Sequence, residues 1–346
     1  MQARAVNSTR LAIHNCNDHG TAVGTTHFFS PHWQNSMSDK KGATLSSKRR
    51  VLALHTSCSK NLLPPSFCTT LNSISQLDTR QGGKMKSARI AYVQWPEGLL
   101  PQGDAWEQIR RAVSAANADL LVTNEMPFGT WLPEQPQYDA AAAQRWVELH
   151  EQALGELSRL DVGAVISSRP VSFGDRLANE AFVVEGDRYR PIHHKKFFPQ
   201  EPGFFEESWF VRGMEGFHCV DIGAVRVGVL LCTELFFNEH ARAYGNAGAD
   251  VIVAPRASGT SLYRWRTAGS LAAIVSGACF VSSNRHGTAP RGQVFGGVGF
   301  AVSADGQPIG ETCEETTLRI ATVDPEATRV QKQEYPCYVR ELAQSS

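Results

Sequence analysis

The chain has 346 residues, with 34 basic and 34 acidic side chains, so its formal net charge is zero. This balance gives no argument for a nucleic acid or an anionic membrane as a partner. No apolar run reaches the roughly 20 residues needed to span a bilayer. The 42% of hydrophobic residues are enough for a sizeable core, as in an ordinary globular enzyme.

The first part of the chain differs from the rest. Residues 1–84 are rich in Ser, Asn and Thr, include the basic run KRR at 48–50, and show no sustained helical or strand period. We interpret them as a disordered or non-native extension, and one explanation is that Met85 is the natural start; a transit peptide is the alternative. The globular domain is predicted to span residues 85–346.

From residue 86 onward, the pattern of apolar residues predicts alternating strands and helices. Two helices are predicted from apolar residues at helical spacing: Trp106, Ile109, Val113 and Ala116 in the first, and Trp146, Leu149, Ala153, Leu157 and Leu160 in the second. Strands are predicted at residues 89–94, 120–123, 162–167, 181–185, 188–193, 225–231 and 251–254. This mixture predicts an α/β sandwich.

The cysteines and histidines give no sign of a metal site. Eight cysteines, at positions 16, 58, 68, 219, 232, 279, 313 and 337, form no CxxC pair and no zinc spacing. A reducing compartment, with the protein in the cytoplasm, is the simplest interpretation. The adjacent His193 and His194 have no further ligand motif nearby, so we interpret them as a structural strand end. We therefore expect neither a metal nor another cofactor.

Three reactive side chains directly follow apolar, strand-like runs. Glu125 ends one such run, Lys195 follows a second, and Cys232 closes a third just before a predicted helix. A helix N-terminus lowers the pKa of a thiol, because its free N–H groups and dipole favour negative charge. Singly, each residue has an ordinary explanation as a solvated charge or a buried inert thiol. We expect the three to converge on one edge of one sheet.

In this order, the three segments resemble the nitrilase superfamily, the carbon-nitrogen hydrolases, from about residue 88 to the C-terminal region. The resemblance rests on NEMPFG at 124–129, HKKFFP at 194–199, CTELFFNEHAR at 232–242, GADVIVAP at 248–255, and SNRHG at 283–287, which matches a turn of the family. Two positions depart from the family pattern. Asn238 stands in place of the usual Pro, and FGGVG at 295–299 has a glycine in place of the usual serine.

The resemblance implies a Glu-Lys-Cys triad that cleaves carbon-nitrogen bonds other than peptide bonds. An amide is a poor electrophile with a poor leaving group, so its cleavage needs a strong nucleophile, a proton carrier and a stabilised oxyanion. Cys232 would form a thioester with the substrate, and Glu125 would carry the proton to the leaving amine and later activate water. Lys195 and the backbone N–H of Thr233 would stabilise the oxyanion.

Adjacent residues compete for two of these positions. The family's second glutamate orients the lysine, and the spacing of three residues before a Phe favours Glu206 over Glu207. Three residues separate Lys195 from the next proline, which is the amidase-like interval. The shorter interval of some nitrile-cleaving members would select Lys196 instead.

The substrate contacts are open to more than one interpretation. Phe128 and Phe236 flank the expected site and would either line an apolar pocket or pack in the core. Arg256 is positioned in the sequence to supply a contact for a substrate carboxylate from another loop. Thr233 follows the nucleophile where nitrile-specialised relatives usually carry Trp, which favours an amide over a nitrile.

The predicted function is hydrolysis of a small carboxamide or N-carbamoyl compound through a cysteine thioester, with release of ammonia or an amine. Three alternatives remain: conversion of a nitrile to a carboxylic acid, acyl transfer from the same thioester, and a non-catalytic binding protein that keeps the fold. The resemblance implies an α-β-β-α sandwich that pairs into a homodimer or a higher homo-oligomer. The small-molecule substrate is the only other partner expected.

Overall fold

The computed structural model describes residues 86–341, so the predicted extension at residues 1–84 lies outside the described part of the chain. The described residues form a 13-stranded mixed sheet with the strand order β5-β4-β3-β2-β1-β11-β10-β9-β8 along its main path. These strands are β1 (Ala88–Pro96), β2 (Leu120–Val122), β3 (Ala164–Phe173), β4 (Arg176–Glu185), β5 (Arg188–His194), β8 (Val220–Ile222), β9 (Val225–Val229), β10 (Val251–Arg256) and β11 (Cys279–Thr288).

Four further strands extend this sheet, and two form a separate hairpin. The extensions are β12 (Val294–Gly296), β13 (Phe300–Val302), β14 (Pro308–Glu311) and β15 (Leu318–Val323), and the hairpin is β6 (Gln200–Glu201) with β7 (Phe204–Phe205). The α-helices are α1 (Asp104–Ala116), α2 (Ala140–Ser158), α3 (Glu206–Trp209), α4 (Asn238–Asn246), α5 (Leu262–Ser276) and α6 (Pro325–Gln331). The short 3₁₀ helices are η1 (Leu132–Glu134) and η2 (Cys232–Phe236). Within residues 86–341, no helix is both long and apolar enough to cross a membrane.

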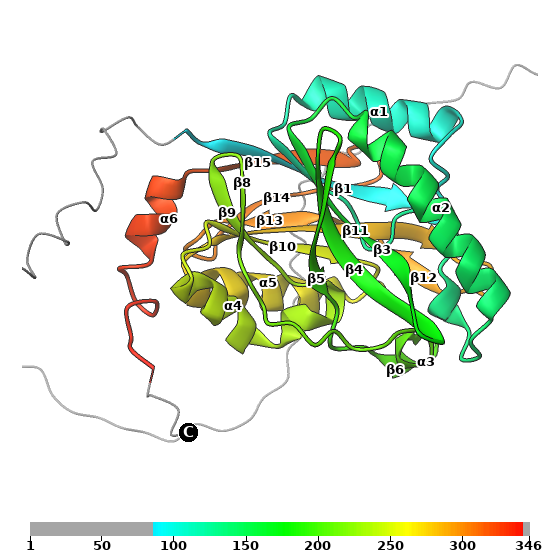
Figure 1. Ribbon diagram of the computed structural model, residues 1–346. Coiled ribbons are helices and arrows are strands. Elements are labelled where there is room, and N and C mark those ends of the chain that lie inside the picture. The colour runs from blue at the N-terminus through cyan, green and yellow to red at the C-terminus, as the bar shows by residue number, and fades with distance from the viewer. Residues whose placement is uncertain (1–85, 342–346) are drawn as a thin grey trace, which may run out of the picture. The chain divides into compact units, whose positions relative to one another are not determined.

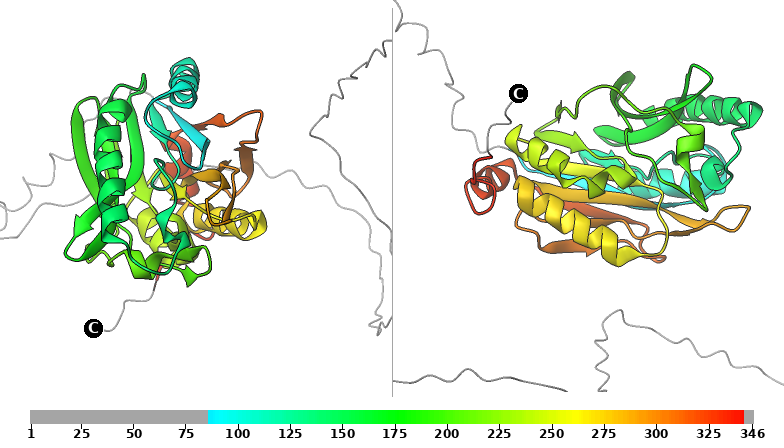
Figure 2. Two further views of the ribbon diagram at one scale, coloured as in Figure 1. Left: turned by 90° about the vertical axis from the view of Figure 1, so that its right-hand side faces the viewer. Right: turned by 90° about the horizontal axis from the view of Figure 1, so that it is seen from below.

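Three apolar clusters define four layers. The first cluster joins the inward faces of the two halves of the sheet, with Ile90 from one half and Val253 from the other. The second packs α1 and α2 on one outer face, for example through Trp106, and the third packs α4 and α5 on the other, for example through Tyr244. Figures 1 and 2 show the strands between these two helix pairs. The predicted α-β-β-α sandwich is therefore confirmed.

The predicted elements are found, although several bounds differ: β3 begins at Ala164 rather than at residue 162, β4 begins at Arg176 rather than at residue 181, and α2 ends at Ser158, before Leu160. Three further differences lie in the segments of β9, η2 and β11. Strand β9 ends at Val229, two residues before the predicted end. An α-helix does not begin directly after Cys232; the 3₁₀ turn η2 comes first, and α4 begins at Asn238. The SNRHG segment, expected to form a turn, lies inside strand β11. Its residues pair with β1, β10 and β12, so sheet pairing decides their conformation rather than local turn propensity.

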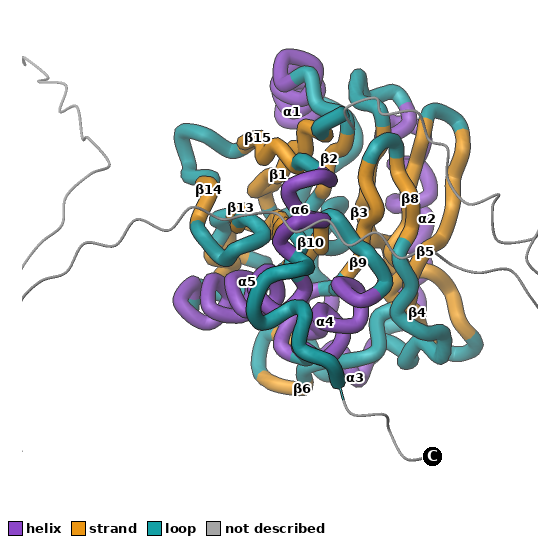
Figure 3. Tube along the Cα trace, turned by 90° about the vertical axis from the view of Figure 1, so that its left-hand side faces the viewer, coloured by secondary structure: helices purple, strands orange, loops and turns teal. Residues whose placement is uncertain are grey.

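The strand directions explain why the three reactive residues can meet. Strands β1, β2, β3, β9, β10 and β11 run parallel, and β5 runs with β3 because both are antiparallel to β4. The carboxyl ends of β2, β5 and β9 therefore lie at the same edge. There the Glu125 N–H donates to the Arg256 carbonyl at 3.2 Å, which joins the two halves of the sheet. At the opposite edge, Thr328 of α6 donates to Asp250 at 2.8 Å. Figure 3 shows α6 in front of β10 in the view from this side.

Candidate active site

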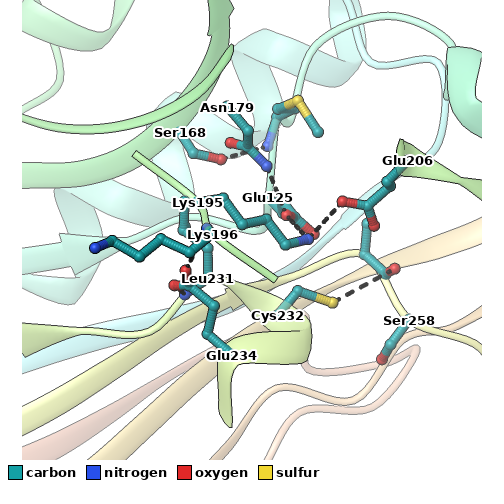
Figure 4. Close-up of polar contacts among 12 residues, drawn as sticks. Glu125, Ser168, Asn179, Lys195, Lys196, Glu206, Leu231, Cys232, Glu234 and Ser258 are labelled. Atoms are coloured by element: carbon teal, nitrogen blue, oxygen red, sulfur yellow. Dashed lines mark hydrogen bonds and ion pairs between the residues drawn. The ribbon is translucent and has the colours of Figure 1, made fainter. Parts of the chain in front are cut away.

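A buried lysine lies between two buried carboxylates at the carboxyl edge of the sheet. Lys195 Nζ donates to Glu125 Oε1 at 2.8 Å and to Glu206 Oε2 at 2.6 Å, and all three side chains are at most 1% exposed. Asn179 Nδ2 also donates to Glu125 Oε1 at 2.8 Å. Figure 4 shows Cys232 beside this group. We call Glu125, Lys195, Glu206 and Cys232 the buried cluster.

The cysteine of the buried cluster has an unusual backbone conformation. Cys232 has φ of 48°, in the left-handed region that non-glycine residues seldom adopt. It is 3% exposed, and its sulfur contacts the Ala257 carbonyl oxygen at 3.9 Å. Such strain persists only where the surrounding structure fixes it, and it is concentrated at functional sites.

Burial, with a contribution from the Glu125 carboxylate, raises the pKa of the Cys232 thiol, and the nearby Lys195 only partly opposes this shift. This corrects the expectation that a helix N-terminus lowers the pKa. The residue opens a short 3₁₀ turn, and loss of hydration outweighs any favourable effect of that turn. The resting thiol is therefore protonated, and a base is needed to activate it.

The charges of the other cluster members depend on one another. Burial raises the pKa of Glu206 to about 8, although the adjacent lysine lowers it. Burial lowers the pKa of Lys195, but the carboxylates of Glu125 and Glu206 outweigh burial and raise it above its ordinary value. Lys195 is therefore a permanent cation at neutral pH. Glu125 Oε2 and Glu206 Oε1 are buried without a hydrogen-bond partner among the described residues.

The structure separates the two pairs of competing neighbours. Lys196 points away from the buried cluster, and its Nζ lies 5.3 Å from the ring centroid of Phe217 (Figure 4). Glu207 is exposed and pairs with Arg212. Of each pair, the residue preferred from the sequence spacing, Lys195 or Glu206, is the one in the buried cluster.

A third buried carboxylate, Glu234, holds the chain segments around the cluster together. Its Oε1 accepts from the Lys196 N–H at 2.7 Å, and its Oε2 accepts from the Leu231 N–H at 2.8 Å. His193 Nε2 lies 2.8 Å from Oε2 and 3.0 Å from Oε1. We call these four residues the brace, because it connects the residues flanking Lys195 to the residue before Cys232. The sequence did not indicate this role, because His193 and Lys196 lie about 40 positions before Glu234 in the chain.

The loop after Glu125 is fixed by a buried arginine. Arg285 donates to the carbonyls of Gly129, at 3.1 Å, and Met126, and it pairs with Glu97. Met126 has φ of 42° and Gly129 has φ of 72°, so the loop turns sharply. Arg285 lies in the SNRHG segment, and the sequence alone did not indicate this contact.

A cavity of about 350 Å³ opens above the buried cluster. Cys232, Glu206 and Thr233 line it together with the 257–261 loop and α5. The rings of Phe236 and Trp265, with centroids 4.7 Å apart, form an aromatic part of the wall. Thr233 and Phe236 are thus at the cavity, as expected for contacts to a substrate.

Two other residues expected to contact the substrate are placed elsewhere. Phe128 is completely buried, and its ring packs against those of Trp95, Trp106 and His150. Arg256 is also completely buried; its guanidinium donates to Ser282 and Ser258 side chains and to the Val298 carbonyl. Neither residue lines the cavity, so both correct the expectation of a substrate contact. Their contacts place both side chains in the core.

Two glycines of the FGGVG segment at 295–299, where the family usually carries a serine, are required by close packing. A Cβ on Gly299 would lie 2.9 Å from the Ser282 and Val93 carbonyl oxygens, and one on Gly296 would lie 2.7 Å from the Gly259 carbonyl oxygen. These distances are shorter than real Cβ contacts. A serine at either position would therefore force the backbone to move.

Comparison with known proteins agrees with this fold. The sequence profile described as "Carbon-nitrogen hydrolase" matches residues 89–333. The chain therefore belongs to the carbon-nitrogen hydrolase family, and the predicted membership of the nitrilase superfamily is confirmed.

The chain is similar in sequence to several curated relatives. It is 29% identical over 176 residues to a glutamine-dependent NAD(+) synthetase of Xanthomonas campestris, covering 49% of this chain and 31% of the relative. It is 31% identical over 178 residues to a nitrilase of Pyrococcus abyssi, covering 48% of this chain and 64% of the relative. It is 24% identical over 254 residues to an N-carbamoylputrescine amidase of Arabidopsis thaliana, covering 67% of this chain and 84% of the relative. The chain thus spans about a third of the first relative and just under two thirds of the second.

Solved structures share the fold. A carbon-nitrogen hydrolase from Helicobacter pylori has a TM-score of 0.64 at 20% identity, over 73% of this chain and 94% of that one. An amidase from a Nesterenkonia species has a TM-score of 0.58 at 22% identity, over 71% of this chain and 94% of that one. At these identities the likeness concerns the fold alone.

Proposed function

We propose that this protein hydrolyses the carbon-nitrogen bond of a small carboxamide or N-carbamoyl compound through a thioester on Cys232. The observation that carries the proposal is the buried cluster, in which a cationic Lys195 bridges the carboxyl groups of Glu125 and Glu206 beside a cavity-lining thiol. The likeness to an N-carbamoylputrescine amidase favours the same class of bond.

In this mechanism Glu125 acts first as the base. The resting thiol is protonated because burial raises its pKa, so the thiol proton passes to Glu125 as Cys232 attacks the carbonyl carbon. The free Oε2 of Glu125 is the atom available to take that proton. The proton then goes to the leaving ammonia or amine, and the same carboxylate later activates the water that hydrolyses the thioester.

The negative charge on the tetrahedral oxygen is stabilised by Lys195 and the backbone N–H of Thr233. A preorganised cation in a buried site stabilises the transition state more strongly than it would in water, because the surrounding dielectric is low. By analogy with other oxyanion-hole donors, loss of one such contact costs about 3 to 4 kcal/mol in the transition state. Glu206 holds Lys195 in place from the other side.

A substrate screen tests the proposal. Purified protein is incubated with matched amides, N-carbamoyl compounds and nitriles, and ammonia release is measured. Turnover of an amide or carbamoyl compound supports the proposal, whereas turnover of nitriles alone would reassign the same thiol to nitrile hydrolysis, the activity named for the Pyrococcus abyssi relative. Adding hydroxylamine distinguishes hydrolysis from acyl transfer, because a transferase would divert most of the acyl group to the added amine. No turnover of any class, with Cys232 unreactive toward iodoacetamide, would support a binding role instead.

We further propose that the protein acts in a reducing compartment, such as the cytoplasm, and as a homodimer or a larger homo-oligomer. A thiol nucleophile must stay reduced to react, and the cysteines of the described region, at 219, 232, 279, 313 and 337, are all free. Light scattering after gel filtration tests the oligomeric state, and a monomeric mass at working concentration would contradict it.

A further inference from the structure

The cavity extends from a buried thiol to a charged mouth. Cys232 is 3% exposed, whereas Glu201 and Arg264, which line the same cavity, are exposed. Together with Glu206 of the buried cluster, they are the charged residues among the described side chains that line it. The solvent side of the cavity thus carries one acidic and one basic side chain.

Arg264 is free to bind a ligand, unlike the two arginines near it in the sequence. The Arg264 side chain makes no ion pair or hydrogen bond within residues 86–341. By contrast, Arg266 pairs with Glu311 at 2.6 Å, and the buried Arg256 donates to serine side chains and a carbonyl. Its place in the first turn of α5 directs Arg264 to the cavity mouth.

Glu201 is equally free. It lies at the end of β6, and its carboxylate forms no ion pair or side-chain hydrogen bond in the described part of the chain. Glu201 and Arg264 therefore form no ion pair with each other, although both line the mouth of the same cavity. Two separate, opposite charges are complementary to a ligand that carries both an ammonium and a carboxylate.

We propose that the substrate is a small carboxamide whose far end is the head group of an α-amino acid; this inference rests on the function proposed above. The substrate carboxylate binds Arg264, whose planar guanidinium matches it in two hydrogen bonds, and the ammonium binds Glu201. The rings of Phe236 and Trp265 provide an apolar wall for the connecting methylenes. The cavity volume of about 350 Å³ is at the small end for ligand sites, which limits the length of that chain.

Four primary amides with the same reacting group test the inference. Glutamine carries both charges, glutaramate only the carboxylate, 4-aminobutanamide only the ammonium, and butanamide neither. The kcat/KM for ammonia release should be highest for glutamine and lowest for butanamide. Each charge should contribute about tenfold, as expected for one charge-assisted hydrogen bond at a solvent-exposed mouth.

Substitutions at the mouth assign each contribution to one residue. Arg264→Met should lower kcat/KM about tenfold for glutamine and glutaramate, and leave 4-aminobutanamide and butanamide nearly unchanged. Glu201→Gln should produce the mirror result. Arg266→Met is the matched control, because Arg266 lies two residues away but is paired with Glu311. It should preserve the order of the four substrates.

The outcomes separate this inference from the proposed function. If butanamide is hydrolysed as well as glutamine, or if Arg264→Met leaves the order unchanged, amide hydrolysis stands and the inference is overturned. If none of the four is hydrolysed, calorimetry on the Cys232→Ala protein still reports recognition. If the Kd for glutamine is about tenfold higher in the Cys232→Ala, Arg264→Met double variant than in the Cys232→Ala protein, the inference is supported independently of catalysis. Absence of glutamine binding overturns it.

Discussion

Glu206 and Glu234 are both completely buried, yet their carboxyl groups have different surroundings. In Glu234 both oxygens accept hydrogen bonds from backbone N–H groups, and His193 contacts both of them. In Glu206, Oε2 accepts a hydrogen bond from Lys195, and Oε1 has no partner among the described residues. Glu206 also lines the cavity. The comparison separates a carboxylate that fixes the chain from one that can respond to a substrate.

The largest effect is expected at the thiol of the buried cluster. Cys232→Ala should lower turnover by at least about 10³-fold, because loss of the nucleophile leaves only binding and oxyanion stabilisation. The free energy of unfolding should change little, as measured by urea titration. Cys219→Ala, at a half-buried thiol away from the cavity, is the control and should keep full activity. Wild-type turnover by a folded Cys232→Ala protein would exclude the mechanism.

The next largest effect is expected at the proton carrier. Glu125→Gln should slow acylation by amides about 10²- to 10⁴-fold, because departure of the amine needs an acid. The leaving group of an activated ester departs without protonation, so such an ester should acylate this variant more readily than an amide does. Intact-mass measurement of the acyl adduct on Cys232 tests both rates. Equal rates for amide and ester would remove Glu125 from the role of general acid.

Lys195→Ala should also abolish amide hydrolysis. No change of pH should restore the activity, since this substitution removes the oxyanion contact itself.

Matched substitutions at the two carboxylates test the comparison directly. Glu234→Gln places an NH₂ group against backbone N–H donors, so it should lower the free energy of unfolding by about 1 to 3 kcal/mol and lower kcat through displacement of the segments beside Lys195. Glu206→Gln keeps one oxygen for Lys195 and should change stability less. Chemical denaturation and kcat are measured on both variants. A larger loss of stability for Glu206→Gln would contradict the division of roles.

A smaller effect concerns pH. The pKa of Glu206 is raised to about 8, so this carboxyl is neutral at pH 7 and gains a negative charge as the pH rises through that value. The added charge opposes formation of the oxyanion beside it, so kcat/KM should fall above about pH 8. Glu206→Gln, which stays neutral, should lose this alkaline limb in a pH profile. A limb that persists unchanged in that variant would assign it to another group.

The smallest effect is expected from a change that touches neither carboxylate. Because residues 1–84 show no periodic apolar pattern, their deletion should leave the melting temperature and turnover nearly unchanged. Differential scanning fluorimetry and the ammonia assay are sufficient measurements. Unfolding of the truncated protein would move the predicted domain boundary toward the N-terminus.

Local patterns in the sequence predicted an α/β sandwich and three residues of the buried cluster, and the family resemblance supplied Glu206 and the order of the layers. Strand ends are visible as apolar runs that stop, and Glu125, Lys195 and Cys232 each directly follow one. The surroundings of each side chain depend on distant contacts. Arg256 follows a strand end as well, but Ser282, from another strand, binds its guanidinium in the core.

The electrostatics of the site could not be predicted from the sequence. A cysteine before a predicted helix indicates a thiol of lowered pKa, but burial, which only the folded structure determines, raises that pKa. The brace depends on contacts between Glu234 and residues about 40 positions earlier in the chain, as the pairing with His193 shows. No local spacing rule describes such contacts.

The backbone conformation of Cys232 has a consequence for inactive variants. Its φ of 48° suits glycine, whereas alanine keeps the Cβ that makes this conformation costly. Cys232→Gly should therefore be at least as stable as Cys232→Ala, although glycine usually destabilises a chain relative to alanine. Cysteine and alanine therefore both retain a local strain that only glycine at this position would relieve, so the protein holds the proposed nucleophile at a cost in stability.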